Sequence, residues 1–382
     1  MENLEKVPVV FVLHAYQPIT QNKEILERII NNCYIPFFSK LLENKEVKIS
    51  LNISGCLLEK LSIEYPEVIK LVEKAILTNQ IELMGSAFYH PILPLLSEED
   101  ITYQIRKQNE IIKGLFDIKP IVFFPPELAI SQSIIPYILR EGFETIICPT
   151  NAINVTYGGV YDVDDRNRIF LLKRNKIISN KIAFDEFKRD DNKTLSEIIK
   201  EYNQFNLPIV LAMDLEAFGE HHGDYYNFFF SLTKKMSLLR VSEMTKEFMI
   251  STRVDFFTSS SWSTTNQDLK EGIYFPLWHD PLNVVHQLQH SHLELLKQVK
   301  SQISEGDWYN DYQAAHYSCQ FWWASEIWWS PELIHTGLIF QKMTLKKMSK
   351  ELSETSKQVI FNLSEYFTNR IDELLSKKRL DK

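Results

Sequence analysis

The sequence predicts an α/β fold in which a closed barrel of about seven strand–helix units precedes a helical bundle region. Short apolar runs alternate with longer amphipathic stretches over roughly the first 260 residues, which indicates parallel strands connected by helices. The runs are apolar at nearly every position, as is typical of strands covered on both faces. Beyond about residue 260 the apolar positions recur at helical spacing, and all seven Trp lie from Trp262 onward.

Residues 1–260 supply the predicted barrel. Ser97 and Asp100 form a pattern that is typical of a helix N-terminus, and a helix is predicted directly after them. The predicted strands are 8–13, 47–53, 81–85, 121–124, 145–148, 168–172 and 208–213, with a further candidate at 254–258. The predicted helices of this part are 23–42, 57–78, 97–115, 131–141 and 194–202.

Residues 261–382 are predicted to form a helical region packed on the barrel. Apolar residues in 283–303 recur at helical spacing, and 331–352 and 355–375 show the same pattern. There is no clear linker before this region, so we expect the two parts to form one rigid unit.

Charge and composition favour an intracellular protein with a neutral or cationic partner, and a neutral sugar polymer is compatible with them. The 382 residues carry a formal net charge of −8 and no basic patch, so nucleic-acid binding is disfavoured. No apolar run is long enough for a membrane span, and the N-terminus lacks a signal-peptide pattern. The four cysteines are scattered without a CxxC pair, which favours free thiols and a cytoplasmic location. The oligomeric state stays open.

Polar residues follow several of the predicted strands at the point where each strand ends. His14, His90 and Glu127 come after three of these runs, and Asp214 and Glu216 come after a fourth. The carboxyl ends of parallel barrel strands meet on one face, where active sites are built. We therefore expect these five side chains to converge although they are far apart in sequence.

Each of these residues also has a purely structural interpretation. A carboxylate after a strand often caps the next helix, and a histidine often satisfies a hydrogen bond in the core. Two prolines precede Glu127 and fix the backbone before it, which favours a functional interpretation. Asp214 and Glu216 are two residues apart at the end of a buried run, where two charges are costly without a purpose.

Five patches in the right order resemble glycoside hydrolase family 57, which includes α-amylases, glucanotransferases and branching enzymes. Each patch is weak alone, but the set spans most of the chain. Two positions depart from the family pattern, because Tyr16 stands at a usual His and Phe124 at a usual Trp. The patches are His14-Ala15-Tyr16-Gln17-Pro18, Glu82 to Leu95, Phe124-Pro125-Pro126-Glu127, Asp214 to Gly219, and His316 to Ser325.

The resemblance implies a distorted TIM-like barrel of seven strands and a retaining enzyme that acts on α-linked glucan or oligosaccharide through a glycosyl-enzyme. It implies that Glu127 is the nucleophile and that Asp214 is the acid/base residue. Neither a cofactor nor a metal ion is expected. The residues expected to contact sugar are His14, Gln17, His90, Glu216, His221, Trp278, Asp280, His316, Phe321 and Trp322.

The sequence leaves three alternatives open. Hydrolysis and glucan transfer share the first half-reaction, so the patches do not separate them. A catalytically silent carbohydrate-binding protein of the same fold is a second alternative, and a metal-dependent polysaccharide deacetylase is a third. His286 and His290 have the spacing of metal ligands on a helix, but we expect both to be solvated helix positions.

Overall fold

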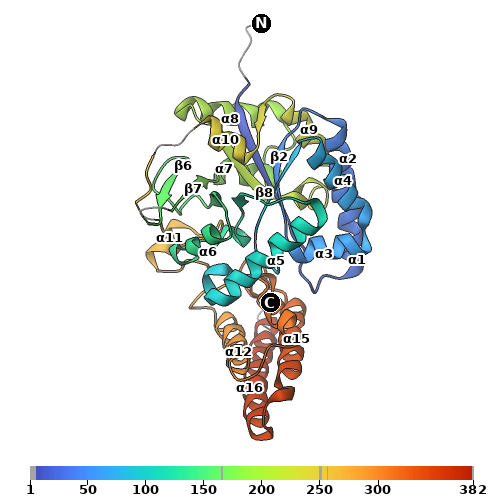
Figure 1. Ribbon diagram of the computed structural model, residues 1–382, viewed down its shortest axis with the longest axis vertical. Helices are drawn as coiled ribbons and strands as arrows, with labels where there is room; N and C mark the ends of the chain where they lie inside the picture. The colour runs from blue at the N-terminus through green and yellow to red at the C-terminus, as the bar shows by residue number, and fades with distance from the viewer. Residues whose placement is uncertain (1–5, 165–166, 249–251, 256, 381–382) are drawn as a thin grey trace. The chain divides into compact units, whose positions relative to one another are not determined.

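The computed structural model describes residues 6–164, 167–248, 252–255 and 257–380. The chain clusters into two compact units. The first, the α/β unit, contains residues 1–17, 21–88 and 93–262. The second, the helical unit, contains residues 18–20, 89–92 and 263–382. The α/β class, the mostly parallel strands and the helical C-terminal region are confirmed (Figure 1).

The described strands of the α/β unit form two sheets. The first sheet has the order β3-β2-β1-β8, with β9 also paired to β1, and all its pairs are parallel. The second has the order β4-β5-β7-β6, and only the β6–β7 pair is antiparallel. Closure of the strands into one seven-stranded ring stays a prediction. The strands are β1 (Pro8–Ala15), β2 (Ile49–Ile53), β3 (Ile81–Met84), β4 (Val122–Phe123), β5 (Thr145–Cys148), β6 (Gly158–Asp162), β7 (Arg168–Lys173), β8 (Ile209–Asp214) and β9 (Ser237–Leu239).

Strand β1 is buried on both faces, and its alternate residues enter two different cores. Phe11 and Leu13 pack in a core with the helices that cover the first sheet. Val10 and Val12 pack on the opposite face, in a core that also receives residues of β3, β4, β5, β7 and β8. Because strands of both sheets contribute to this second core, the inner faces of the two sheets are buried together.

Two predicted helices of the α/β unit are interrupted. The predicted helix 23–42 contains a π-helical turn, Ile30–Tyr34, between α1 and α2. The predicted helix 57–78 breaks before Pro66, whose ring cannot continue a helix. Helices α1 to α4 lie together beside β2 (Figure 1). The α-helices are α1 (Lys23–Ile29), α2 (Ile35–Glu43), α3 (Gly55–Glu64), α4 (Pro66–Leu77), α5 (Glu98–Phe116), α6 (Ile135–Arg140), α7 (Lys176–Ala183), α8 (Asp191–Phe205), α9 (Tyr226–Thr233) and α10 (Val241–Glu247).

Strands β6 and β9 were not predicted from the sequence. Strand β6 begins with Gly158 and Gly159, a residue type depleted in strands. A Cβ at Gly158 would lie 2.3 Å from the backbone oxygen of Leu171, so the close pairing with β7 requires glycine there. Strand β9 has only three residues, too few to show an alternating pattern.

The helical unit is built around three long helices, α12, α15 and α16, that run beside one another (Figure 1). Its buried interior contains a polar network as well as apolar side chains. His292 bonds Gln341 Oε1 through Nδ1 at 2.8 Å, and Gln341 donates to Gln320 Oε1 at 2.6 Å. The helices are α11 (Asn266–Lys270), α12 (Val284–Lys300), α13 (Tyr309–Ala314), α14 (Cys319–Trp322), α15 (Pro331–Met348) and α16 (Glu354–Leu380).

Across the residues that the structure describes, no helix combines the length and the apolar character that crossing a bilayer requires.

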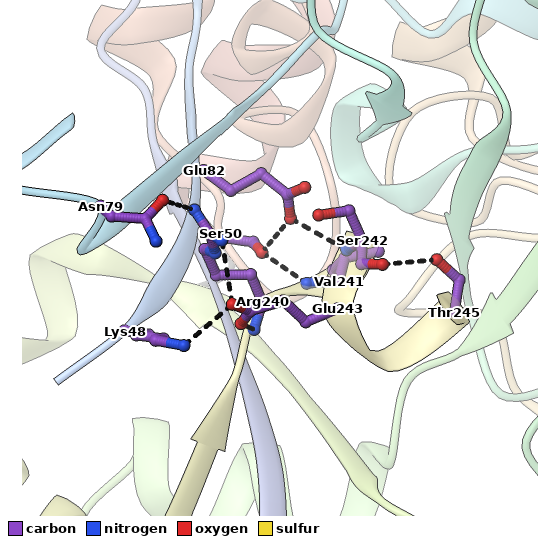
Figure 2. Close-up of polar contacts among 9 residues, drawn as sticks. All are labelled: Lys48, Ser50, Asn79, Glu82, Arg240, Val241, Ser242, Glu243 and Thr245. Atoms are coloured by element: carbon purple, nitrogen blue, oxygen red, sulfur yellow. Dashed lines mark hydrogen bonds and ion pairs between the residues drawn. The ribbon is translucent and has the colours of Figure 1, made fainter. Parts of the chain in front are cut away.

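Charged and polar side chains connect the start of α10 to β2 and β3 (Figure 2). Ser50 Oγ accepts from the backbone N–H of Val241 at 2.9 Å, and Glu82 Oε2 accepts from the backbone N–H of Ser242 at 3.2 Å. These bonds satisfy N–H groups that have no partner within a helix. Glu82, part of the second patch, therefore acts as a helix cap.

Glu243 completes this connection with two cations. Its Oε1 accepts from Lys48 Nζ at 2.8 Å and from Arg240 Nη2 at 2.9 Å (Figure 2). Partial burial of Glu243 opposes ionisation, but the bonds from Arg240 and Lys48 outweigh that effect and lower the carboxyl pKa to about 2. The ionised carboxylate is thus favoured by the folded state.

We predict that Glu243→Gln lowers the free energy of unfolding at neutral pH by about 1–2 kcal/mol, because the amide loses its charge-assisted bonds. The folded pKa lies below the ordinary value of 4.5, so this contribution is complete above pH 4.5 and disappears as the pH falls toward 2. Urea unfolding at several pH values measures it. Glu247→Gln, an exposed position on the same helix, is the control. An equal loss at pH 3 and pH 7 would contradict the assignment.

Candidate active site

The carboxyl ends of β1, β2 and β8 bring three polar side chains to adjacent positions. His14 is the register partner of Asn52 on β2 and of Asp214 on β8. His14 Nδ1 lies 2.7 Å from Asn52 Oδ1, and the Asn52 amide donates to Met84 O at 3.3 Å. This orientation of the amide makes Nδ1–H the donor and leaves Nε2 as an acceptor. Burial lowers the His14 pKa to about 4 against the opposing bond from Asn52, so the ring is neutral at neutral pH.

Aromatic rings hold the His14 imidazole in place. Phe124 stacks on it with ring centroids 4.8 Å apart, and Tyr16 lies nearly parallel at 6.2 Å. Trp262 meets the imidazole edge-on at 6.4 Å. Phe124 and Tyr16 are the two departures from the family pattern, and both place a flat ring against His14. Phe124 directly precedes Pro125 and Pro126, so this stack also positions the start of the Glu127 turn.

Glu127 lies in a strained turn that directly follows β4. Its φ is 58° and that of the next residue, Leu128, is 47°, a left-handed conformation that is uncommon for residues other than glycine. Three backbone bonds hold the turn, including one from the Trp262 N–H to Glu127 O at 3.1 Å. Such strain costs of the order of 1–3 kcal/mol per residue and concentrates at functional sites. The turn thus presents a carboxylate on a fixed backbone.

Asp214 ends β8 and is half-buried. Burial raises its pKa to about 6, while the charge of Arg174 acts in the opposite direction. Arg174 is buried and fixed by bonds from Nε to Ala212 O and from Nη2 to Asn180 Oδ1, each 2.7 Å long. Its guanidinium also lies 5.4 Å from the centre of the Trp262 ring. Burial lowers the pKa of Arg174 to about 10, so it stays positively charged at neutral pH.

Glu216 is buried and accepts three hydrogen bonds on one oxygen. Tyr34 Oη donates to Oε1 at 2.5 Å, Gln17 Nε2 at 3.1 Å and the Tyr16 N–H at 3.3 Å. Burial and the neighbouring Asp214 charge raise the Glu216 pKa to about 7, although the bonds from Tyr34 and Gln17 favour ionisation. Tyr34 is the last residue of the π-helical turn, a feature often found at functional sites.

His221 is exposed and lies in the loop that follows Glu216. Its backbone N–H donates to Glu216 O at 3.0 Å. Partial burial and the adjacent His222 lower the His221 pKa, and Glu220 opposes them. Exposure leaves the His221 ring available to a ligand, whereas His222 bonds Ala183 O at 3.0 Å.

The remaining predicted residues belong to the helical unit. His90 is buried, has a left-handed φ of 58° and bonds Ser318 Oγ through Nδ1 at 2.9 Å. Its backbone oxygen accepts from the Ser318 N–H at 3.0 Å. His316 is also buried and bonds Tyr312 O through Nδ1 at 2.9 Å. The segment with His90 is therefore bound to the fifth patch.

Trp278, Asp280 and Phe321 surround the first turns of α12. Trp278 is only 1% exposed, and its backbone oxygen lies 3.0 Å from His290 Nε2. The His290 ring stacks on Phe321 with centroids 4.2 Å apart. The backbone N–H of Asp280 donates to His286 Nδ1 at 3.2 Å. Trp278 and Phe321 are buried, so stacking of sugar on either ring stays a prediction.

The expectation that His286 is a solvated helix position is wrong. His286 is fully buried, and its Nε2 lies 2.9 Å from Phe321 O. Burial lowers its pKa to about 4. The loop before α12, through the Asp280 N–H, and α14, through Phe321 O, supply backbone partners for the ring, which helical spacing alone does not reveal.

In the α/β unit the structure brings together His14, Asp214 and Glu216, three of the five side chains expected to converge at strand ends, and it adds Gln17, which bonds Glu216. It adds residues that were not predicted, namely Tyr34, Asn52, Arg174 and Trp262. Asn52 and Arg174 lie at or just after the ends of β2 and β7, so the rule that selected His14 would also have found them. Tyr34 lies within a predicted helix, where no signal distinguished it from a core residue.

We predict that Arg174→Met raises the pKa of Asp214 above about 6, because it removes the positive charge that lowers the pKa of this buried carboxyl. Arg174→Lys retains the charge and should leave that pKa closer to the original value. Carbon-detected NMR titration, with Asp214→Asn to assign the signal, measures both. An unchanged Asp214 pKa in Arg174→Met would show that the guanidinium acts only as a structural donor.

We predict that Glu216→Gln stabilises the protein relative to the original chain as the pH rises. The Glu216 carboxyl has a pKa of about 7 in the folded protein and 4.5 ordinarily. As the pH rises from 4.5 to 7, this carboxyl therefore ionises in the unfolded state while it remains largely protonated in the folded state. The folded state therefore loses about 3 kcal/mol of stability across that interval, and a glutamine does not. Urea unfolding at pH 4.5 and pH 8 tests this, with Glu247→Gln as control. A pH-independent difference would contradict the raised pKa.

The chain is similar to several known proteins. An α-amylase of Pyrococcus furiosus is 30% identical over 146 residues, covering 36% of this chain and 22% of that protein. The chain thus spans less than a quarter of that relative's length. The crystal structure of 4-α-glucanotransferase from Thermococcus litoralis has a TM-score of 0.74 at 18% identity, covering 92% of this chain and 60% of the other.

The branching enzyme of Pyrococcus horikoshii also shares the fold, with a TM-score of 0.68 at 14% identity over 95% of this chain and 96% of the other. The profile described as glycosyl hydrolase family 57 matches residues 5–255, which include the patches around His14, Glu127 and Asp214. Because that match covers more than half of the chain, the protein belongs to glycosyl hydrolase family 57.

Proposed function

We propose that this chain is a retaining enzyme that hydrolyses or transfers α-linked glucan, with Glu127 as nucleophile and Asp214 as acid/base residue. The observation that carries the proposal is the raised pKa of Asp214, about 6, at the end of a buried strand beside His14. A carboxyl with this pKa is substantially protonated in weakly acidic solution and can act as a general acid. The membership of family 57 supplies the substrate class.

In the first half-reaction the Glu127 carboxylate attacks the anomeric carbon of the glucosyl residue. The glycosidic C–O bond breaks, and Asp214 donates its proton to the departing oxygen. The products are a glucosyl ester of Glu127, a shortened glucan with a new hydroxyl group and ionised Asp214. The strained turn at Glu127 supports this role, since a rigid backbone limits the positions that the carboxylate can adopt.

In the second half-reaction ionised Asp214 takes a proton from water or from a sugar hydroxyl. The oxygen of that molecule attacks the anomeric carbon, which releases Glu127 and restores the protonated Asp214. Attack by water completes hydrolysis, and attack by a sugar hydroxyl completes transfer. The charge of Arg174 favours the ionised Asp214 that this step requires.

The neighbouring residues fit a sugar-binding role. His14 stays neutral in the neutral range and is the register partner of Asp214, and we infer that it contacts a sugar hydroxyl beside that carboxyl. Gln17 and Glu216 bond each other, and we infer that they set the shape of the subsite beside Asp214. The expected contacts of His90, His221, Trp278, Asp280, His316, Phe321 and Trp322 with substrate belong to the same proposal.

We infer further that the two sheets are arcs of one seven-stranded barrel made of β1, β2, β3, β4, β5, β7 and β8. The core that receives side chains from both sheets supports closure. A parallel bridge between Gly85 and Phe123 connects the sheets on one side, and a bond from the Asn175 N–H to Val210 O, 2.8 Å long, connects them on the other. We also propose a cytoplasmic location, which suits the buried thiols of Cys33, Cys56 and Cys148.

We predict that Glu127→Gln and Asp214→Asn each lower the turnover of maltoheptaose by at least about 10³-fold, because each removes a group that acts on the reacting bond. Chromatography of all products measures this. Shorter sugars alone would identify a hydrolase, and shorter and longer sugars together a glucanotransferase. Glu247→Gln is the control for loss of a carboxylate elsewhere on the α/β unit.

Two outcomes would contradict the proposal. Full activity of either variant would exclude the assigned role of that residue. Binding of maltoheptaose without turnover, by a correctly folded chain, would favour a silent carbohydrate-binding protein. The family match makes a polysaccharide deacetylase the less favoured alternative.

A further inference from the structure

The helical unit has an exposed aromatic side chain, Trp328, that is paired with a second tryptophan, Trp322. Trp328 stacks on Trp322 with ring centroids 4.9 Å apart and an angle of 18° between the planes. Trp328 is nevertheless 49% exposed. Because Trp322 lies against one face of the indole, the exposed area belongs to the opposite face and the ring edges. A nearly flat aromatic surface is therefore open to solvent.

The backbone around Trp328 holds this surface rigidly. Ala324 and Trp329 form an antiparallel bridge, and the Ser330 N–H donates to Trp323 O at 3.0 Å. The Trp328 N–H itself lies 3.3 Å from Ser325 Oγ. Ala324 and Trp323 are buried in the core of the helical unit and anchor the loop. A rigid surface loses little conformational entropy when it binds a ligand.

Two further exposed apolar side chains are Ile327, on the same loop as Trp328, and Leu282, on an adjoining loop. Asn283 Nδ2 donates to Ala324 O at 2.8 Å and joins this loop to the one that contains Trp328. Leu282 is 79% exposed and Ile327 is 74% exposed. Such a cluster marks a site of interaction more often than an isolated exposed residue does. The area of these side chains is of the order of a few hundred Å², below the roughly 800 Å² per partner that a stable protein interface buries.

We propose that the open face of Trp328 binds a pyranose ring of an α-glucan. A pyranose presents C–H groups on its flat face and hydroxyls around its rim, so its flat face suits stacking on an exposed indole. Glu326, two residues before Trp328, is exposed and can accept bonds from sugar hydroxyls. The inference takes its class of ligand, α-glucan, from the proposed function. It adds a surface that binds the glucan without cleaving it.

Affinity electrophoresis through gels that contain amylopectin tests this surface. Trp328→Ala should raise the dissociation constant for amylopectin about 3- to 10-fold, the effect expected for loss of one aromatic stacking contact. Trp328→Phe should restore most of the retardation, because it keeps a flat ring. Tyr366→Ala is the matched control, since Tyr366 is a 62% exposed aromatic residue on α16 of the same unit. Melting curves check that each variant is folded.

The outcomes separate this inference from the proposed function. Equal retardation of the original chain and Trp328→Ala would overturn the inference, as would a lack of retardation of the original chain. A third outcome is that Trp328→Ala is retarded as strongly as the original chain but elutes as a smaller particle in size-exclusion chromatography. That outcome would identify Trp328 as a contact between copies of the chain and would also overturn the inference. Turnover of maltoheptaose by the original chain, measured separately, decides the proposed function and not this one.

Discussion

The structure of the α/β unit depends on the burial of both faces of β1. Residues that alternate along this strand enter two different cores, one beneath the helices and one shared by both sheets. Strands that are covered on both faces are typical of parallel sheets, and they are apolar over most of their length, which favours polar residues at their ends. His14 and Asp214 each lie at the end of an otherwise apolar strand, and they are neighbours because β1 and β8 pair in parallel register. The apolar pattern thus determines where polar chemistry is possible.

The electrostatics of the candidate site follow from the same burial. Burial raises the pKa values of Asp214 and Glu216, because it disfavours a charged carboxylate. Burial lowers the pKa of His14 for the same reason, because it disfavours the charged imidazolium. Arg174 and Tyr34 then adjust these carboxyls separately, the first by charge and the second by a short hydrogen bond. One desolvated location therefore contains two acids with different partners, which allows their protonation states to differ.

The sequence predicted the parts of the structure that have a local signal. Seven strands and most helices could be placed because apolar runs and helical spacing are visible along the chain. The π-helical turn at Tyr34 could not be placed, since its sequence continues the apolar pattern of a helix. The left-handed pair Glu127–Leu128 was also invisible, because neither residue is glycine and the conformation depends on bonds to a distant segment. The burial of His286 depends on partners around it that spacing does not identify.

The division of the chain has a consequence for its modularity. The polypeptide passes between the two units at residues 17–18, 20–21, 88–89, 92–93 and 262–263. Two short segments from the N-terminal part thus belong to the helical unit, where Ile19 packs in the core and Pro91 bridges to Tyr317. Cutting after residue 262 would leave those segments without their partners. In evolution the helical unit could not be exchanged as a simple cassette, because its core is encoded in three separate parts of the gene.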